Sequence, residues 1–164
     1  MTVDHFPGTR FFRNTLVLAT AFAILSSMTL PGPASAITPS TTAVTSITVG
    51  SSPEAVAVSP DGSSVWVTNA GSGTVSRINT TTNAVTSITV GTQPSGVVVS
   101  PDGSSVWVTN YGSGTVSRID TATNAVTSIT VGSYPRYGVV VSPDGSSVWV
   151  TNYASGTVSR INTA

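Results

Sequence analysis

The sequence predicts an all-β protein assembled from repeated four-stranded units. Residues 51–91 and 92–132 align without a gap and differ at only eight of 41 positions. A third copy begins at Ser133 and carries one extra residue. Each copy holds four short runs rich in Val, Ile, Thr and Trp, separated by Gly, Pro, Asn and Asp, a pattern typical of strands joined by turns. Helical periodicity is absent beyond residue 36.

The first 36 residues read as an export signal rather than as part of the fold. Arg10 and Arg13 precede an apolar run at 16–30, and Ala34-Ser35-Ala36 has the small-x-small pattern of a cleavage site. A run of about fifteen apolar residues is short for a bilayer span, which needs roughly 20. We therefore expect cleavage after Ala36, no stable membrane insertion afterwards, and a secreted or cell-envelope protein.

The composition excludes several classes of function. Charged residues make up only 7% of the chain, and no Lys is present, so the basic surface that nucleic-acid binding requires is not expected. The chain has no Cys, which excludes disulfides, a lipid-anchored cysteine and thiolate metal sites. Its single His is His5, inside the predicted signal.

The elements of one unit can be assigned in order. The first run, 55–59, ends in Ser-Pro-Asp-Gly, where Pro suits the second position of a type I turn and Gly the left-handed position after it. The second run, 64–68, precedes an Asn-Ala-Gly-Ser-Gly turn, and the third is 74–78. The fourth is 84–90, and its sequence AVTSITV recurs ahead of the first full copy, in 43–50.

Units of this kind must stack on one another. Runs such as Val97-Val98-Val99 do not alternate with polar residues, which indicates strands covered on both faces. Radial stacking of four-stranded antiparallel sheets is the β-propeller, and residues 37–164 hold about three blades' worth of strands: units 51–91, 92–132 and 133–164. A parallel β-helix is the alternative, but its coils are shorter and lack four hairpin turns per unit.

Two repeated strings resemble one known family. Ser-Pro-Asp-Gly-Ser-Ser-Val-Trp-Val-Thr-Asn and Gly-Thr-Val-Ser-Arg-Ile-Asn/Asp-Thr resemble the YVTN β-propeller repeat, and the likeness covers essentially all of 43–164. Trp66, Trp107 and Trp149 stand where that family usually has Tyr. The resemblance implies an exported or surface propeller. Related propellers include lactonases and lyases, an analogy at the level of fold alone.

The sequence offers no catalytic residue, no metal site and no cofactor site that we would assign. Asp61, Asp102 and Asp144 recur in every unit and could in principle form an acid–base or calcium ring. Their Pro-Asp-Gly setting favours a purely structural role in turns. Arginines recur at positions 77, 118 and 160. We expect their aliphatic stems to pack on apolar strands; a continuous basic stripe is the alternative. We expect the tryptophans to pack between units.

Most differences between copies fall in loops that would lie on one face of the propeller, here called the rim. In a propeller the fourth-to-first and second-to-third strand loops share a face. Five of the eight differences fall in those loops, and so do all four tyrosines. Aromatic and Arg side chains on rigidly held loops suit a binding surface, and the alternative is that the tyrosines only cover the gaps between blades. The candidate ligand-binding residues are Glu54, Gln93, Tyr111, Tyr134, Arg136, Tyr137 and Tyr153.

The function expected from these features is non-catalytic binding or surface interaction, with a protein or carbohydrate ligand. A lactonase- or lyase-like enzyme and a truncated propeller without independent function are the alternatives. Counting 43–49 as a fourth strand gives twelve strands, whereas closed propellers have four to eight blades. Two chains joined head to tail would close a six-bladed ring, so we expect a homodimer; an aggregating or degraded fragment is the alternative.

Overall fold

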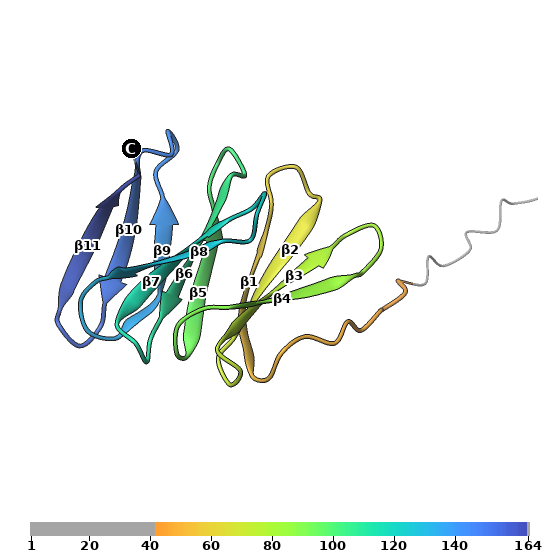
Figure 1. Ribbon diagram of the computed structural model, residues 1–164, viewed down its shortest axis with the longest axis horizontal. Helices are drawn as coiled ribbons and strands as arrows, with labels where there is room; N and C mark the ends of the chain where they lie inside the picture. Colours follow the sequence, from red (N-terminus) through yellow and green to blue (C-terminus); the bar gives the residue numbers. More distant parts are fainter. Residues whose placement is uncertain (1–41, 164) are drawn as a thin grey trace, which may run out of the picture. The chain divides into compact units, whose positions relative to one another are not determined.

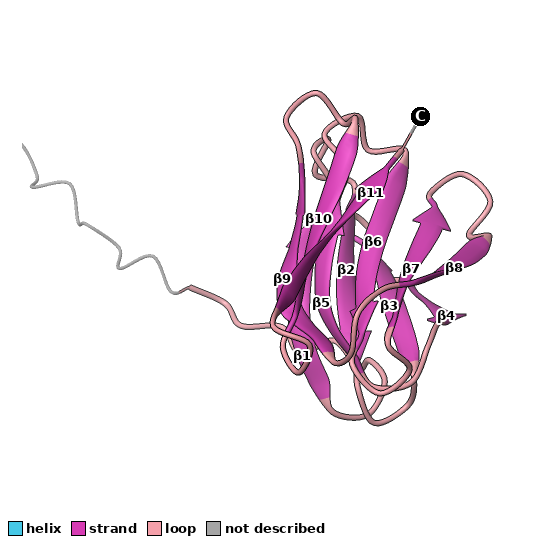
Figure 2. Ribbon diagram, turned by 90° about the vertical axis from the view of Figure 1, so that its left-hand side faces the viewer, coloured by secondary structure: helices cyan, strands magenta, loops and turns pink. Residues whose placement is uncertain are grey.

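The computed structural model describes residues 42–163, in which all regular secondary structure is β-strand (Figures 1 and 2). The strands lie in the compact unit Val44–Ala164. They are β1 (Pro53–Val58), β2 (Ser64–Asn69), β3 (Thr74–Asn79), β4 (Val85–Thr89), β5 (Pro94–Val99), β6 (Ser105–Asn110), β7 (Thr115–Asp120), β8 (Val126–Thr130), β9 (Pro135–Val141), β10 (Ser147–Asn152) and β11 (Thr157–Asn162).

The strands form three antiparallel sheets in chain order. The first two sheets have four strands each, β1–β4 and β5–β8, and the third has three, β9–β11. Within each sheet every strand pairs with the next one along the chain, so the connections are hairpins. The three sheets lie side by side in Figure 1. The predicted all-β class and repeated antiparallel sheets are confirmed.

The sheets converge at their first strands. β5 contacts both β1 and β9, the first strands of the neighbouring sheets. Figure 2 shows β4 and β8 on the side away from β1, β5 and β9. First strands that gather together while fourth strands diverge are the arrangement of blades around an axis.

Each pair of neighbouring sheets encloses a core. Between the first and second sheets, Trp66 and Val75 pack against Val106, Val108 and Ile119, all of them buried. The packing between the second and third sheets repeats this pattern, with Trp107 and Val116 in the equivalent places. The expected role of these tryptophans in packing between units is therefore confirmed for the two that are enclosed.

The predicted fourth strand at 43–49 is absent. Residues 42–49 adopt no regular secondary structure, so the described chain has eleven strands rather than the expected twelve. The same sequence forms β4 and β8 where β3 and β7 supply a partner. A strand needs a neighbouring strand for its backbone hydrogen bonds, and residues 42–49 have none within the described range.

Candidate functional site

On one rim, backbone hydrogen bonds join two sets of loops. The segment that precedes the first strand of each sheet, here called the entering link, is hydrogen-bonded to the turn after that sheet's second strand. These bonds join Ala70 N to Ser52 O at 2.9 Å, Tyr111 N to Gln93 O at 2.9 Å, and Tyr153 N to Tyr134 O at 3.1 Å. The loops that carry the differences between copies therefore lie together in all three sheets, as the sequence predicted.

A left-handed residue occupies the same place in each entering link. Ser52, Gln93 and Tyr134 have φ values of 52°, 51° and 52°, and each precedes a proline. Positive φ is uncommon for residues other than Gly, and a bonded loop is needed to hold it. The backbone is thus the same in the three links, while the side chain that it displays changes from Ser to Gln to Tyr.

An aromatic and cationic cluster covers part of this rim. The rings of Tyr111 and Tyr134 stack with centroids 4.8 Å apart and an interplanar angle of 24°. The guanidinium of Arg136 lies 5.5 Å from the centre of the Tyr111 ring and 4.8 Å from that of Tyr137. Its Nη2 donates a hydrogen bond of 3.2 Å to the Tyr137 hydroxyl. Arg136 is thereby held by two aromatic rings from two sheets.

A cavity of about 200 Å³ opens beside this cluster. Its lining comes from all three sheets: Glu54, Ala70, Gln93, Ser95, Tyr111 and Arg136. The buried Ser95 hydroxyl shares a 3.1 Å hydrogen bond with Thr109 Oγ1, which fixes the cavity's wall. The Tyr137 hydroxyl, with smaller contributions from Tyr111 and Glu54, raises the pKa of Arg136.

The structure brings together most, but not all, of the candidate residues. Four of the seven line the cavity: Glu54, Gln93, Tyr111 and Arg136. Tyr134 stacks on Tyr111, and Tyr137 contacts Arg136, without lining the cavity. Tyr153 is 77% exposed and belongs to neither group. The candidate set lacked Ala70 and Ser95, although both are among the eight positions that differ between the first two copies, which was the signal for them.

One difference between copies is explained by packing rather than by ligand binding. Gly96 stands where the first copy has Ala55. A Cβ at Gly96 would lie 2.6 Å from the carbonyl oxygen of Tyr137. Tyr137, which has φ 48° and lies in the segment with the third copy's extra residue, is thus packed against β5.

Comparison with known proteins places this geometry in a family. Residues 32–163 match the family model of the YNCE-like beta-propeller. The chain belongs to that family. The membership confirms the propeller class, with about three blades that do not close, and the predicted relationship to YVTN-type propeller repeats. No curated protein matches the sequence.

Several solved propellers share the fold. Hydrazine synthase from Kuenenia stuttgartiensis is 29% identical with a TM-score of 0.66, over 75% of this chain and 36% of that one. Virginiamycin B lyase from Staphylococcus aureus is 25% identical with a TM-score of 0.61, over 69% and 39%. A proposed 6-phosphogluconolactonase from Bacteroides fragilis, at 19% and 0.60 over 70% and 36%, shows the fold alone. The chain spans less than two fifths of these structures' length.

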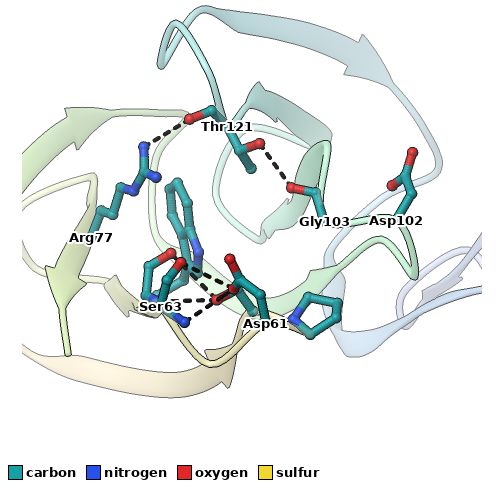
Figure 3. Close-up of a pocket in the computed structure, with 10 residues that line it drawn as sticks. Asp61, Ser63, Arg77, Asp102, Gly103 and Thr121 are labelled. Carbon is teal, nitrogen blue, oxygen red and sulfur yellow. Dashed lines mark hydrogen bonds between the residues drawn. The ribbon is translucent and has the colours of Figure 1, made fainter. Parts of the chain in front are cut away.

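The opposite rim of the propeller has a second cavity, which is shown in Figure 3. It lies between the first two blades, and its lining residues Arg77 and Thr121 form hydrogen bonds within the protein. The buried Nε1 of Trp66, which also lines the cavity, has no hydrogen-bond partner in residues 42–163. Arg77 Nη1 donates to Thr121 O at 2.8 Å, and Thr121 Oγ1 donates to Gly103 O at 2.8 Å. The first bond joins the two blades and the second lies within the second blade, and the residues that make them are shared by the repeats. We therefore assign this cavity a structural role.

The recurring arginines sit over the recurring tryptophans. In each blade the Arg of the third strand lies across from the Trp of the second. The guanidinium carbons of Arg77, Arg118 and Arg160 lie 5.0, 5.8 and 5.4 Å from their indole centres. This is the packing role expected for these arginines, rather than a continuous basic stripe.

The recurring aspartates hold the turn between the first two strands of each blade. Asp61 accepts hydrogen bonds from Ser59 Oγ at 2.6 Å and from Ser63 N at 3.0 Å. The same bonds recur at Asp102 and Asp144. The serine hydroxyl, followed by the backbone N–H, lowers the pKa of each carboxyl from 3.8 to about 2. The structural interpretation of these aspartates is confirmed.

These turns predict a loss of stability in acid. A carboxyl whose pKa is lower in the folded state stabilises the fold above its unfolded pKa, and that contribution is lost as the pH falls through the folded pKa. We expect the urea midpoint to fall between pH 4 and pH 2. Substituting Asn for Asp61, Asp102 and Asp144 together should weaken this dependence. Equal acid sensitivity in both proteins would contradict the assignment.

Residues 42–163 contain neither a candidate metal site nor a membrane-spanning helix. No group of three or more His, Cys, Asp or Glu side chains in that range is placed to hold a metal ion. No helix long and apolar enough to span a membrane occurs in that range. The export signal predicted at residues 1–36 lies outside the described part of the chain.

Proposed function

We propose that this chain is an exported, non-catalytic propeller module that binds a carbohydrate in the rim cavity. The observation that carries the proposal is the position of Arg136. Its guanidinium lies near the rings of both Tyr111 and Tyr137, at the edge of a cavity of about 200 Å³. Glu54 and Gln93 also line this cavity. Small-molecule sites combine aromatic surface with a few oriented polar groups in this way.

The chemistry of the cavity suits a ring with several hydroxyl groups. A tyrosine face packs against the apolar C–H face of a sugar and keeps a polar edge for hydrogen bonding. Arg136 has five N–H donors, of which the structure engages one, with Tyr137. The carboxylate of Glu54 accepts hydrogen bonds, and the amide of Gln93 both donates and accepts. Donors and acceptors therefore surround a partly aromatic surface.

The ionisable groups favour binding over catalysis. Beyond residue 36 the sequence has no His, Cys or Lys, the side chains that most often titrate near neutral pH or act as nucleophiles. The rim cavity offers Glu54, Tyr111 and Arg136. A lyase- or lactonase-like enzyme is the competing function, because virginiamycin B lyase is among the similar structures. Fold similarity alone does not assign an activity.

Binding can be tested with a panel of neutral and acidic oligosaccharides, using calorimetry or changes in NMR spectra. For any sugar that binds, Arg136→Ala and Tyr111→Ala should each weaken the affinity by about 1–2 kcal/mol, which is roughly 5- to 30-fold. Tyr111→Phe should retain most of the affinity because the ring is kept. Tyr153→Ala is the matched control, since Tyr153 is an exposed rim tyrosine outside the cavity.

Three results would overturn the proposal. Equal losses for Tyr153→Ala and Tyr111→Ala would show that the cavity is not the site. Unfolding of the Tyr111 and Arg136 variants would show that these residues stabilise the packing between blades and do not form a binding site. Turnover of a lactone or a cyclic peptide would favour the enzyme. Export is tested separately by N-terminal sequencing of secreted protein, with Ile37 as the expected first residue.

A further inference from the structure

The third blade exposes apolar groups that are buried in the other two. Trp149 is 42% exposed, whereas Trp66 and Trp107 are buried. Val158 is 59% exposed, whereas its equivalents, Val75 and Val116, are completely buried. The sequences around these residues are the same in the three copies, so the difference comes from the missing neighbour and not from the residues themselves.

The first blade exposes the matching surface. Within the chain, Trp66 and Val75 are covered by Val106, Val108 and Ile119, with Val97 and Val99 packed beside them. The corresponding residues of the first blade are identical: Val56, Val58, Val65, Val67 and Ile78. Of these, Val56 and Val58 are exposed. The open face of the first blade is thus a copy of the face that covers a tryptophan elsewhere in the chain.

Within residues 42–163 the third blade has no fourth strand, although another segment has the sequence of one. β11 has the sequence TVSRIN of β3, and β3 pairs with β4 through Val75 opposite Ile88 and Ile78 opposite Val85. Residues 44–48 have the sequence VTSIT of β4 and β8 but adopt no strand. The same register on β11 would place Ile47 opposite Val158 and Val44 opposite Ile161.

We propose that two copies of this chain join head to tail, and that residues 44–48 of each copy form the fourth strand of the other copy's third blade. The first blade of each copy then covers Trp149 and Val158 of its partner. Two copies give six blades, within the range of four to eight that closes a propeller, and the two interfaces are equivalent. The proposal does not depend on the ligand of the rim cavity.

A chain cannot complete its own third blade in this way. Residues 44–48 lead directly into the first blade, where Gly50 is packed against Asn69 and Ser72. The second blade packs against both the first and the third and therefore separates them. Residues 44–48 of a second copy are not restricted in this way.

The oligomeric state tests the proposal directly. Protein expressed from residues 1–164 should have twice the mass of one chain in light scattering. Ile47→Asp should reduce it to a monomer, because an aspartate would enter the core opposite Val158. The fold should survive, since residue 47 lies in no strand of the single chain. Thr45→Asp is the matched control, because its equivalent Thr86 faces solvent in the first blade.

A cross-link tests the register. The chain has no native Cys, so Ile47→Cys with Val158→Cys introduces one defined pair. Oxidation should yield a covalent dimer, while Ile47→Cys with Ser159→Cys, one residue out of register, should yield much less. A wild-type monomer, a disulfide within one chain, or an open series of higher oligomers would each overturn the two-copy ring.

Discussion

Trp107→Ala is expected to lower the free energy of unfolding by about 3–5 kcal/mol, the usual cost of deleting a large buried aromatic side chain. Trp107 lies in the core between the second and third blades, packed with Val116, Val139, Val148 and Val150. Its Nε1 also donates a hydrogen bond of 3.1 Å to Ser105 Oγ. Urea unfolding followed by circular dichroism measures the loss. The substitution removes contacts from both blades at once.

The same chain provides the control for this experiment. Trp149→Ala makes the same chemical change at the partly exposed position of the third blade. In the Ile47→Asp background, where single chains are expected, it should cost clearly less than Trp107→Ala. Equal losses at the two positions would contradict the burial difference on which both the core and the proposed second copy rest.

Asn110→Ala is expected to cost about 1–3 kcal/mol, the penalty for leaving buried polar groups without partners. Asn110 Nδ2 donates to Thr115 Oγ1 at 3.0 Å and to Ser117 Oγ at 2.9 Å. Its Oδ1 accepts a hydrogen bond from Gly91 N at 3.2 Å. The buried amide of Asn110 therefore connects the link that enters the second blade with the β6–β7 hairpin of the same blade. Denaturant unfolding measures the loss.

Asn152→Ala is the matched comparison. Asn152 makes the same two donor bonds, to Thr157 and Ser159, but its Oδ1 has no partner in the described chain. Its replacement should therefore cost less than that of Asn110. The reverse order would show that the bond to Gly91 contributes little and that the link is held by packing.

The repeated elements could be predicted from sequence because their signals are local. Ser-Pro-Asp-Gly determines a turn wherever it occurs, and Gly62, Gly103 and Gly145 all have positive φ there. Strand limits were less accurate: β1 begins at Pro53 rather than at residue 55, because Pro53 still lies opposite Asn69 beyond a β-bulge. Residues 43–49 failed as a strand because strand formation depends on a distant partner.

The sequence predicted which loops carry the candidate site but not how the side chains of the site are arranged. Sequence differences located Tyr111 and Arg136 on loops of one face. They could not reveal that Arg136 lies near the rings of both Tyr111 and Tyr137, because Arg136 and Tyr137 belong to the segment with the extra residue, for which the first two copies offer no template. Tyr153 shares the face, but its side chain is exposed and does not line the cavity.

Identical strand sequences have a consequence for folding. β3, β7 and β11 offer nearly the same edge, so β4 could pair with β7 as well as with β3. The correct pairing closes a loop of residues 80–84, whereas the wrong one closes residues 90–114. Loop-closure entropy separates these by only about 1.5 kcal/mol. Correct folding therefore relies on short links forming hairpins early, before later blades present competing edges.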